Sequence, residues 1–260
     1  MRYGLIGEKL GHSYSKIIHE KLADYTYDLI PLTRDEFSEF MKKKEFTAIN
    51  VTIPYKQDVI PYLDELHPLA KEIGAVNTIV NKNGHNIGYN TDFYGFKYML
   101  EHNNIQITDK KCLILGTGGT SHTVHAVLKH LGAKEIYIVS RSDKNDRIIS
   151  YERCYKDHLN ADIVINTTPV GMYPNIDASP IDLTTFTKCE AVVDAIFNPI
   201  KTKLTLQAEA LNKKAVTGLE MLVAQAKQAI EYFLEQPLED SLIDRTYQEL
   251  LEILTLQTKE

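Results

Sequence analysis

The sequence predicts an α/β protein with two lobes, and three observations lead to this fold class. Near the middle of the chain, the apolar run Cys112–Leu115 ends in clustered glycines and is followed by an amphipathic helix. Before this point, strand-like and helix-like segments alternate. After it comes a second series of strands with helical connections, which is typical of a doubly wound parallel sheet. We therefore expect an N-terminal α/β domain, a doubly wound second domain and a cleft between them.

Composition and charge are those of an ordinary globular protein. The chain has 260 residues, 43% hydrophobic and 25% charged, which is long enough for one large or two modest cores. Its net charge is −6 and its basic residues are scattered, which argues against a nucleic-acid-binding face. No apolar run approaches the ~20 residues of a membrane span. Three cysteines are too few for a disulfide framework, so we expect a cytoplasmic protein.

In the first half, short strands and helices alternate, and Asn83-Gly84 predicts a hairpin turn. The predicted strands are Tyr3–Gly7, Tyr25–Ile30, Phe46–Val51 and Ala75–Val80, with a returning strand that runs to Asp92. The predicted helices are Ile17–Leu22, Arg34–Lys44, Leu66–Ile73 and Phe93–Glu101. Polar clusters follow the strands, where open α/β sheets bind ligands.

Four polar side chains at these strand ends are candidate functional residues. Ser13 and Ser15 either cap the helix that follows or bind a carboxylate or polyol through their hydroxyls. Lys56, held after its strand by a turn at Pro54, is either solvated or able to exchange protons. Asp92 either caps the next helix or faces Lys56 and controls its charge.

The glycine turn has the features of a dinucleotide site. A strand, a tight turn and a helix direct backbone N–H groups and the positive end of the helix to one point, which suits a pyrophosphate. Gly116 would allow the turn and Gly118 the close approach of phosphate, while Ser121 stands where a third glycine or alanine is usual. An ordinary strand-to-helix turn is the alternative on this motif alone.

The next strand, Glu135–Val139, ends in Ser140-Arg141-Ser142. About 20 residues after the glycine fingerprint, an acid usually binds the ribose 2′-hydroxyl of NAD. An arginine between two hydroxyls instead suits a 2′-phosphate, because arginine binds phosphate bidentately. The sequence therefore favours NADP, while the nearby Asp143 keeps NAD open.

The rest of the second half continues the alternation. Further strands are predicted over Ala161–Asn166, Ala191–Ala195 and Ala215–Thr217, and helices over Leu204–Leu211, from Gly218 onward and near Leu238–Leu254. His122 and His125 have the spacing of metal ligands, but no acid or cysteine completes a set, so we predict surface histidines and no metal site. Gln225 either lies on a solvated helix face or turns into the cleft.

Several motifs in order resemble the shikimate dehydrogenase family, and the match extends from Gly7 to Gln225. They are His12-Ser13-Tyr14-Ser15, Asn50-Val51-Thr52-Ile53-Pro54-Tyr55-Lys56, Gly74-Ala75-Val76-Asn77-Thr78, Gly88-Tyr89-Asn90-Thr91-Asp92, Gly116-Thr117-Gly118-Gly119, Asn166-Thr167-Thr168-Pro169-Val170-Gly171-Met172 and Met221-Leu222-Val223-Ala224-Gln225. The resemblance implies NADP-dependent, reversible reduction of 3-dehydroshikimate to shikimate in aromatic amino-acid biosynthesis.

The resemblance also implies a role for each matching residue. Lys56 and Asp92 would be the catalytic pair, and Ser13 and Ser15 would bind the substrate carboxylate. The ring hydroxyls would be held by Thr52, Asn77, Asp92 and Gln225. NADP would be bound by Gly116, Thr117, Gly118, Gly119, Thr120, Ser140, Arg141 and Ser142, with Thr168, Gly218 and Met221 at its nicotinamide end.

The implied organisation is a substrate-binding domain over residues 1–103, with residues 226–260 packed back on it, and a Rossmann-like NADP-binding domain over 104–225. This chain departs from the family pattern where Lys9 and Lys16 replace common prolines, Ser140 replaces an asparagine and Phe197 replaces a tyrosine. Two rivals stay open: a quinate/shikimate dehydrogenase that uses NAD or NADP, and a dinucleotide-binding sensor without turnover. The partner expected is a small molecule, and the chain is expected to be a monomer or homodimer.

Overall fold

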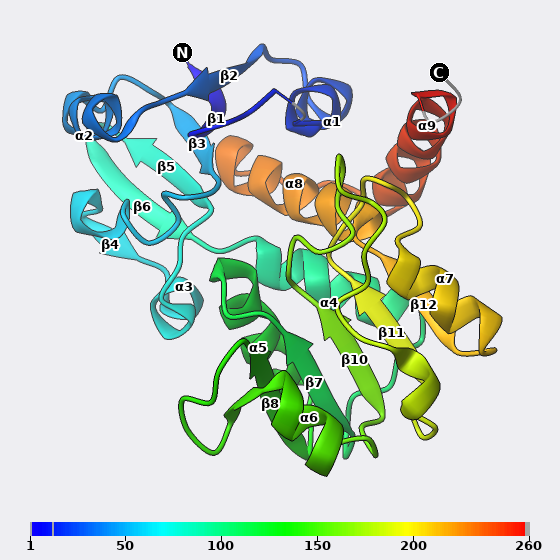
Figure 1. The fold of residues 1–260 in the computed structure, drawn as a ribbon. Coiled ribbons are helices and arrows are strands. Elements are labelled where there is room, and N and C mark those ends of the chain that lie inside the picture. Colours follow the sequence, from blue (N-terminus) through cyan, green and yellow to red (C-terminus); the bar gives the residue numbers. More distant parts are fainter. Residues whose placement is uncertain (1, 12, 258–260) are drawn as a thin grey trace. The chain divides into compact units, whose positions relative to one another are not determined.

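A computed structural model describes residues 2–11 and 13–257 (Figure 1). His12, the first residue of one motif, therefore lies outside the described residues. The chain divides into two compact units. The first contains the described residues up to Gly95 together with Leu222–Thr246, and the second contains Phe96–Met221 together with the described residues from Tyr247 onward. Within the described residues, each unit is built around one six-stranded sheet.

The sheet of the first unit has the order β2-β1-β3-β5-β6-β4 and mixed strand directions. Its strands are β1 (Tyr3–Gly7), β2 (Tyr27–Pro31), β3 (Ala48–Val51), β4 (Glu65–Leu66), β5 (Thr78–Lys82) and β6 (His85–Tyr89). Strand β1 pairs in parallel with β2 and β3, whereas β5 runs antiparallel to both β3 and β6. Strands β1, β3 and β6 therefore end at the same edge of the sheet, and β5 begins there.

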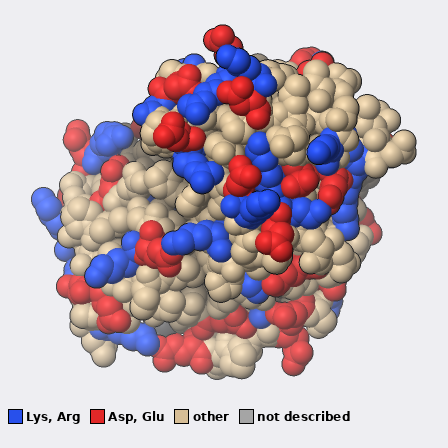
Figure 2. Space-filling view, turned by 90° about the horizontal axis from the view of Figure 1, so that it is seen from below, with Lys and Arg blue, Asp and Glu red and all other residues tan. Residues whose placement is uncertain are grey.

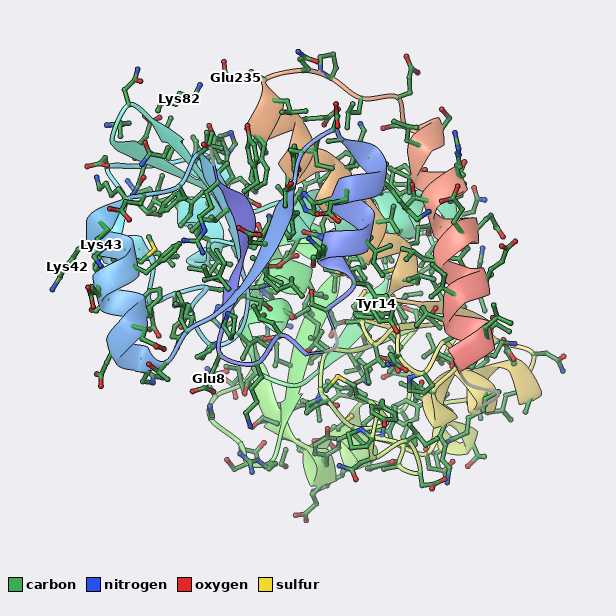
Figure 3. All side chains as sticks on the ribbon, turned by 90° about the horizontal axis from the view of Figure 1, so that it is seen from above. Glu8, Tyr14, Lys42, Lys43, Lys82 and Glu235 are labelled. Atoms are coloured by element: carbon green, nitrogen blue, oxygen red, sulfur yellow. The ribbon has the colours of Figure 1, made fainter. Side chains whose placement is uncertain are left out.

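Helices cover both faces of this sheet because both faces are apolar. The helices are α1 (Ser15–Leu22), α2 (Arg34–Lys43), η1 (Ile60–Tyr62) and α3 (Pro68–Ile73), joined by the first turn of α4 (Asp92–His102) and most of α8 (Leu219–Leu234). Helix α2 begins with a capping box formed by Thr33 and Glu36. Ala229 and Phe233 of α8 pack against one face, and an ion pair joins Lys82 of β5 to Glu235 (Figure 3).

The second unit has a fully parallel sheet with the order β12-β11-β10-β7-β8-β9. Its strands are β7 (Lys111–Leu115), β8 (Glu135–Ser140), β9 (Ile148–Ser150), β10 (Ile163–Asn166), β11 (Ala191–Asp194) and β12 (Lys214–Thr217). Its connections include α5 (Gly119–His130), α6 (Tyr151–Asp157), η2 (Leu183–Thr185) and α7 (Lys203–Ala210), and α9 (Ser241–Gln257) extends into it. The strand order reverses beside β7, so the predicted α/β fold with a doubly wound second sheet is confirmed.

Several predicted boundaries differ from the observed ones. Strands β4 and β9 and helix α6 were not predicted, because elements of two to seven residues are too short for a periodic pattern. The helix predicted from Leu66 begins instead at Pro68, since Leu66 pairs with Gly88 in the sheet. The three cysteines are buried and reduced, and burial raises the thiol pKa to about 12 in Cys112 and about 11 in Cys154 and Cys189.

Three further observations concern the charged side chains, the helices and the predicted surface histidines. On the face shown in Figure 2, Lys and Arg side chains are interspersed with Asp and Glu side chains. Within the described part of the chain, no helix combines the length and apolar character that crossing a membrane requires. His122 and His125 are exposed on α5.

Candidate active site

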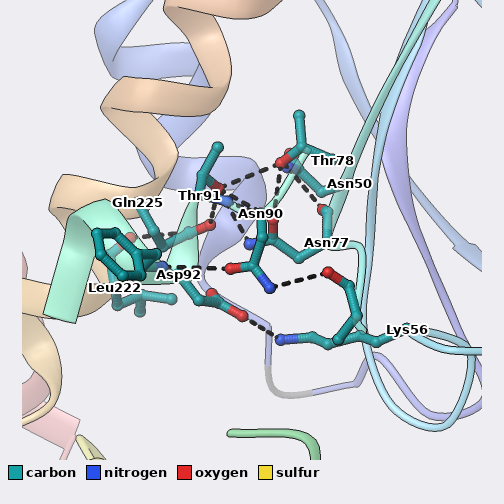
Figure 4. A network of polar contacts seen from close by, with 11 residues as sticks. Asn50, Lys56, Asn77, Thr78, Asn90, Thr91, Asp92, Leu222 and Gln225 are labelled. Carbon is teal, nitrogen blue, oxygen red and sulfur yellow. Dashed lines mark hydrogen bonds and ion pairs between the residues drawn. The ribbon is translucent and has the colours of Figure 1, made fainter. Parts of the chain in front are cut away.

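Lys56 and Asp92 form an ion pair in the first unit (Figure 4). The Lys56 Nζ donates to Asp92 Oδ2 at 2.6 Å. Their side chains are only 18% and 11% exposed, so little water competes for this contact. The two residues are 36 positions apart in the chain. They meet because β3 and β6 end at the same edge of the sheet.

The backbone on either side holds this pair in place. After β3, the Tyr55 N–H donates to the Thr52 carbonyl at 3.0 Å and the Val76 N–H donates to the Lys56 carbonyl at 2.8 Å. At the start of α4, the Asn90 side chain accepts the Phe93 N–H at 3.2 Å and donates to the Ala75 carbonyl at 3.0 Å. Asn90 therefore supplies a cap to α4, and the Asp92 carboxylate turns to Lys56, the second of the two alternatives for this residue.

Beside the pair lies a buried cluster of amides and hydroxyls. Asn77 Oδ1 accepts the Thr91 N–H at 2.7 Å, and Asn77 Nδ2 donates to Thr91 Oγ1 at 3.0 Å. The Thr91 hydroxyl in turn donates to Gln225 Oε1 at 3.4 Å, and Gln225 Nε2 donates to the Leu222 carbonyl at 2.9 Å. Gln225 is only 9% exposed, so it belongs to this cluster and not to a solvated helix face.

Thr91 is a residue whose position the sequence analysis did not interpret. It is fully buried, and its hydroxyl joins two of the predicted hydroxyl-binding residues, Asn77 and Gln225. The available signal was its place between Asn90 and Asp92 at a strand end. This place indicates that Thr91 lies near the candidate site. It does not indicate that Thr91 bonds Gln225, because that residue lies on a helix 134 positions further along the chain.

Ser13, Ser15 and Thr52 follow the two adjacent strands β1 and β3. Ser15 begins α1 and is buried, and the Ser13 hydroxyl accepts the Ser15 N–H at 3.3 Å. The N-cap residue of α1 is Tyr14, so neither serine takes the N-cap position, the first of the two alternatives for these residues. A side chain on Gly7 would bring a Cβ within 2.5 Å of Thr52 Cγ2, so the glycine makes room for this threonine.

The glycine turn of the second unit has the predicted conformation at its first glycine. Gly116 has φ 106°, and a Cβ there would lie 2.9 Å from Thr168 Cγ2. A Cβ on Gly118, the N-cap residue of α5, would meet nothing within 4 Å, which leaves room for a ligand at the helix N-terminus. Ser121 replaces the usual third glycine by donating its hydroxyl to the Gly118 carbonyl at 2.7 Å. Thr117, Gly119 and Thr120 complete the turn and the first turn of α5.

The end of β8 presents Arg141 to solvent. The Ser140 hydroxyl donates to the Ser142 carbonyl at 2.9 Å and accepts the Ser142 N–H at 3.3 Å, which folds the backbone around the exposed arginine. The Asp143 carboxylate accepts the Ser150 N–H at 2.8 Å, and this bond lowers the Asp143 pKa. The acid that kept NAD open therefore binds the backbone of Ser150, the last residue of β9.

The remaining predicted cofactor residues also lie in the second unit. The Thr168 hydroxyl donates to Asn166 Oδ1 at 2.7 Å, directly after β10 and beside Gly116. Gly218 follows β12, and a Cβ there would lie 2.1 Å from the Ala195 carbonyl oxygen. Met221 is buried in the first turns of α8. The structure thus groups the predicted substrate and catalytic residues in the first unit and the predicted cofactor residues in the second.

The chain is similar to known proteins in both sequence and structure. A family model described as the shikimate dehydrogenase substrate binding domain matches residues 5–79. The chain is 41% identical to a shikimate dehydrogenase (NADP(+)) from Clostridium beijerinckii, covering 94% of this chain and 96% of that protein. The structure of a chorismate mutase/shikimate 5-dehydrogenase fusion protein from Clostridium acetobutylicum is similar, with a TM-score of 0.91, 36% identity and coverage of 97% and 98%. Quinate dehydrogenase from Corynebacterium glutamicum in complex with NAD is also similar, with a TM-score of 0.86, 26% identity and coverage of 97% and 99%.

Proposed function

The chain belongs to the shikimate dehydrogenase family, and on this premise we propose that it catalyses the NADP-dependent, reversible reduction of 3-dehydroshikimate to shikimate in aromatic amino-acid biosynthesis. The observation that carries the proposal is the 2.6 Å contact between Lys56 and Asp92. A lysine paired with a carboxylate among buried hydrogen-bonding groups is suited to moving a proton during a carbonyl reduction.

In this mechanism Lys56 is the general acid. When bound, NADPH supplies the hydride that reduces the ring carbonyl carbon. Lys56 Nζ donates a proton to the carbonyl oxygen as negative charge develops there, so the product gains one hydride and one proton. Asp92, whose carboxylate accepts the hydrogen bond from Lys56 Nζ, orients the lysine before the transfer. General acid–base catalysis of this kind contributes about 10²–10⁴-fold to the rate.

The other polar residues of the first unit would bind the substrate. Ser13 and Ser15, near the N-terminus of α1, would donate hydrogen bonds to the carboxylate, which the helix dipole also favours. The ring hydroxyls would be held by Thr52, Asn77, Asp92 and Gln225. Thr91, which bonds to both Asn77 and Gln225, would keep these two amides in position.

The residues of the second unit fit NADP. The open space at Gly118 and the N-terminus of α5 suit the pyrophosphate, and Thr117, Gly119 and Thr120 would contribute to that turn. Arg141, between Ser140 and Ser142, would bind the 2′-phosphate. Thr168, Gly218 and Met221 would contact the nicotinamide end. We thus propose a substrate-binding first unit and an NADP-binding second unit.

The decisive experiment compares two lysine variants in shikimate oxidation, followed by NADPH absorbance. Lys56→Met should lower kcat by about 10²–10⁴-fold and leave shikimate binding within a few-fold. Lys44→Met is the matched control, because Lys44 forms a 2.7 Å ion pair with Asp64 in the same unit, away from the candidate site. Near-normal turnover by Lys56→Met would remove this lysine from the mechanism.

The similarity to quinate dehydrogenase makes a second activity worth testing. Shikimate and quinate should each be assayed with NADP+ and with NAD+. Turnover with shikimate and NADP+ alone supports the proposal. Turnover with quinate or NAD+ would move the chain to the sister activity with the same Lys56–Asp92 pair. No turnover in any arm, with NADP binding intact, would favour a dinucleotide-binding sensor and direct attention to Phe197.

Two general properties complete the proposal. A small biosynthetic dehydrogenase with three reduced, buried cysteines fits a reducing cytoplasm. We propose a monomer or homodimer in solution, which light scattering across a range of protein concentrations would distinguish.

A further inference from the structure

Tyr27, the first residue of β2, contacts α1 on one side and Asn50 on the other. Its side chain is fully buried, and β2 is an edge strand of the sheet. The backbone and ring of Tyr27 contact α1, whereas its hydroxyl contacts the polar cluster around Asn77. No role for this residue follows from its position in the sequence.

On one side, three side chains of α1 hold Tyr27. Lys16 Nζ donates to the Tyr27 carbonyl at 2.8 Å, and Glu20 Oε1 accepts the Tyr27 N–H at 2.9 Å. Lys16 and Glu20 also pair with each other at 2.6 Å. The His19 ring stacks on the Tyr27 ring, with centroids 4.0 Å apart and an interplanar angle of 18°. These contacts occupy the outward N–H and C=O of an edge-strand residue and fix α1, which begins at Ser15, against β2.

On the other side, the Tyr27 hydroxyl holds Asn50. It donates to Asn50 Oδ1 at 2.7 Å in a buried contact. Asn50 Nδ2 donates to the Asn77 carbonyl at 3.2 Å and to Thr78 Oγ1 at 3.0 Å. Because a carbonyl can only accept, the Asn50 atom that faces it must be the nitrogen, and Tyr27 must be the donor to Asn50 Oδ1.

From Asn50 a network of hydrogen bonds extends to the proposed hydroxyl-binding residues (Figure 4). Thr78 accepts from Asn50 and donates to Asn77 Oδ1 at 3.1 Å. Asn77 Nδ2 then donates to Thr91, and Thr91 donates to Gln225, as described above. Tyr27 and Asn50 are themselves buried, so a donor lost at Tyr27 would not be replaced by water.

We propose that Tyr27 is a positioning residue that holds the carboxylate-binding and hydroxyl-binding parts of the substrate site in register. This inference rests on the proposed function, because it assigns Ser13 and Ser15 to one part of the substrate and Asn77 and Gln225 to the other. Tyr27 touches neither the substrate nor the reacting atoms. It acts through α1 on the first part and through Asn50 on the second.

The test is the variant Tyr27→Phe, which removes only the hydroxyl and keeps the stacked ring. The KM for shikimate should rise about three- to tenfold, the equivalent of one net hydrogen bond, while kcat and the KM for NADP+ stay within about twofold. Tyr62→Phe is the control, because the Tyr62 hydroxyl bonds Ser38 at 2.5 Å in the same unit, outside this chain of hydrogen bonds. Tyr62→Phe should leave all three constants unchanged.

A second pair of variants tests the α1 side. Lys16→Met should also raise the KM for shikimate, because the hydrogen bond from Lys16 to the Tyr27 carbonyl is lost. The control is Lys43→Met, which removes an i,i+4 ion pair of the same 2.6 Å length, to Glu39 on α2 (Figure 3). This variant should leave the KM for shikimate unchanged. The variant Thr78→Val already lacks one hydroxyl of this hydrogen-bond network. In that background, Tyr27→Phe should add little to the KM for shikimate.

Three results would overturn the inference: an unchanged KM for shikimate in Tyr27→Phe, an equal rise in the KM for NADP+, or full additivity with Thr78→Val. The wild-type assay separates these from a failure of the proposed function. If the wild type does not oxidise shikimate, the function itself is wrong. If it does and Tyr27→Phe behaves like Tyr62→Phe, only the positioning role is wrong.

Discussion

Acidification should destabilise the protein through one buried histidine, His19. The side chain is 1% exposed, stacks on Tyr27 and bonds the Tyr25 hydroxyl through Nδ1 at 2.7 Å. Burial lowers the pKa of His19 from its usual 6.5 to about 3. The neighbouring phenols do not titrate in this range, because burial raises the pKa of both Tyr25 and Tyr27. Protonation of His19 therefore requires either a buried unpaired charge or unfolding.

The sign and size of the effect follow from linkage. Between pH 6.5 and pH 3 the unfolded chain binds a proton that the folded chain does not, so the free energy of unfolding falls as the pH falls. The slope approaches about 1.4 kcal/mol per pH unit. At pH 5 the loss relative to pH 7 is about 2 kcal/mol, and the full stability is present above pH 6.5.

Urea unfolding of the wild type and of His19→Phe at pH 7, 6 and 5 measures this effect. The phenylalanine keeps the stacking on Tyr27 and cannot titrate. The lost hydrogen bond between His19 and Tyr25 therefore changes the free energy of unfolding by the same amount at each pH. The difference between the two free energies of unfolding should therefore change by about 2 kcal/mol from pH 7 to pH 5. His122→Gln, at an exposed histidine, should retain the wild-type slope. Parallel curves for wild type and His19→Phe would refute the assignment.

Three further predictions concern the second unit. Gly116→Ala should lower the free energy of unfolding by about 1–3 kcal/mol, because φ is 106° and Thr168 Cγ2 lies 2.9 Å from the new Cβ. Gly118→Ala should retain stability but weaken NADP binding, because its Cβ enters the open space at the N-terminus of α5. Scanning calorimetry measures the stability, and titration calorimetry measures the binding. The three buried cysteines should react with a thiol reagent only on unfolding, since burial raises their pKa; fast labelling of the folded protein would contradict this. Arg141→Ala should raise the KM for NADP+ at least about tenfold and leave that for NAD+ unchanged, and an equal rise for both would argue against a 2′-phosphate contact.

Local sequence patterns predicted most of the elements. The apolar run at Cys112 and the glycines after it correspond to β7, the turn at Gly116 and the start of α5, because each depends on residues near one another in the chain. The turn at Asn83-Gly84 was also predictable, because Asn and Gly tolerate the positive φ that both residues adopt there. Short elements such as β4 and α6 were not predicted, because they depend on pairing and packing with distant residues.

The candidate site was predictable as a set of strand ends but not as a set of contacts. Ser13 and Lys56 follow predicted strands, Asp92 ends one, and the family resemblance assigned their roles. Whether Asp92 would cap α4 or face Lys56 could not be decided, because the answer depends on Asn90 and on the antiparallel turn between β5 and β6.

The sequence by itself determined most of the strands and helices, the glycine turn, the arginine after β8 and the family. These features depend on side-chain periodicity, backbone freedom and short motifs, all of which are local. The tertiary structure alone decided that β1, β3 and β6 end at one edge, that Gln225 joins Thr91, and that Tyr27 contacts both α1 and Asn50. Such contacts join residues tens of positions apart, and only sheet pairing and core packing bring them within hydrogen-bonding distance.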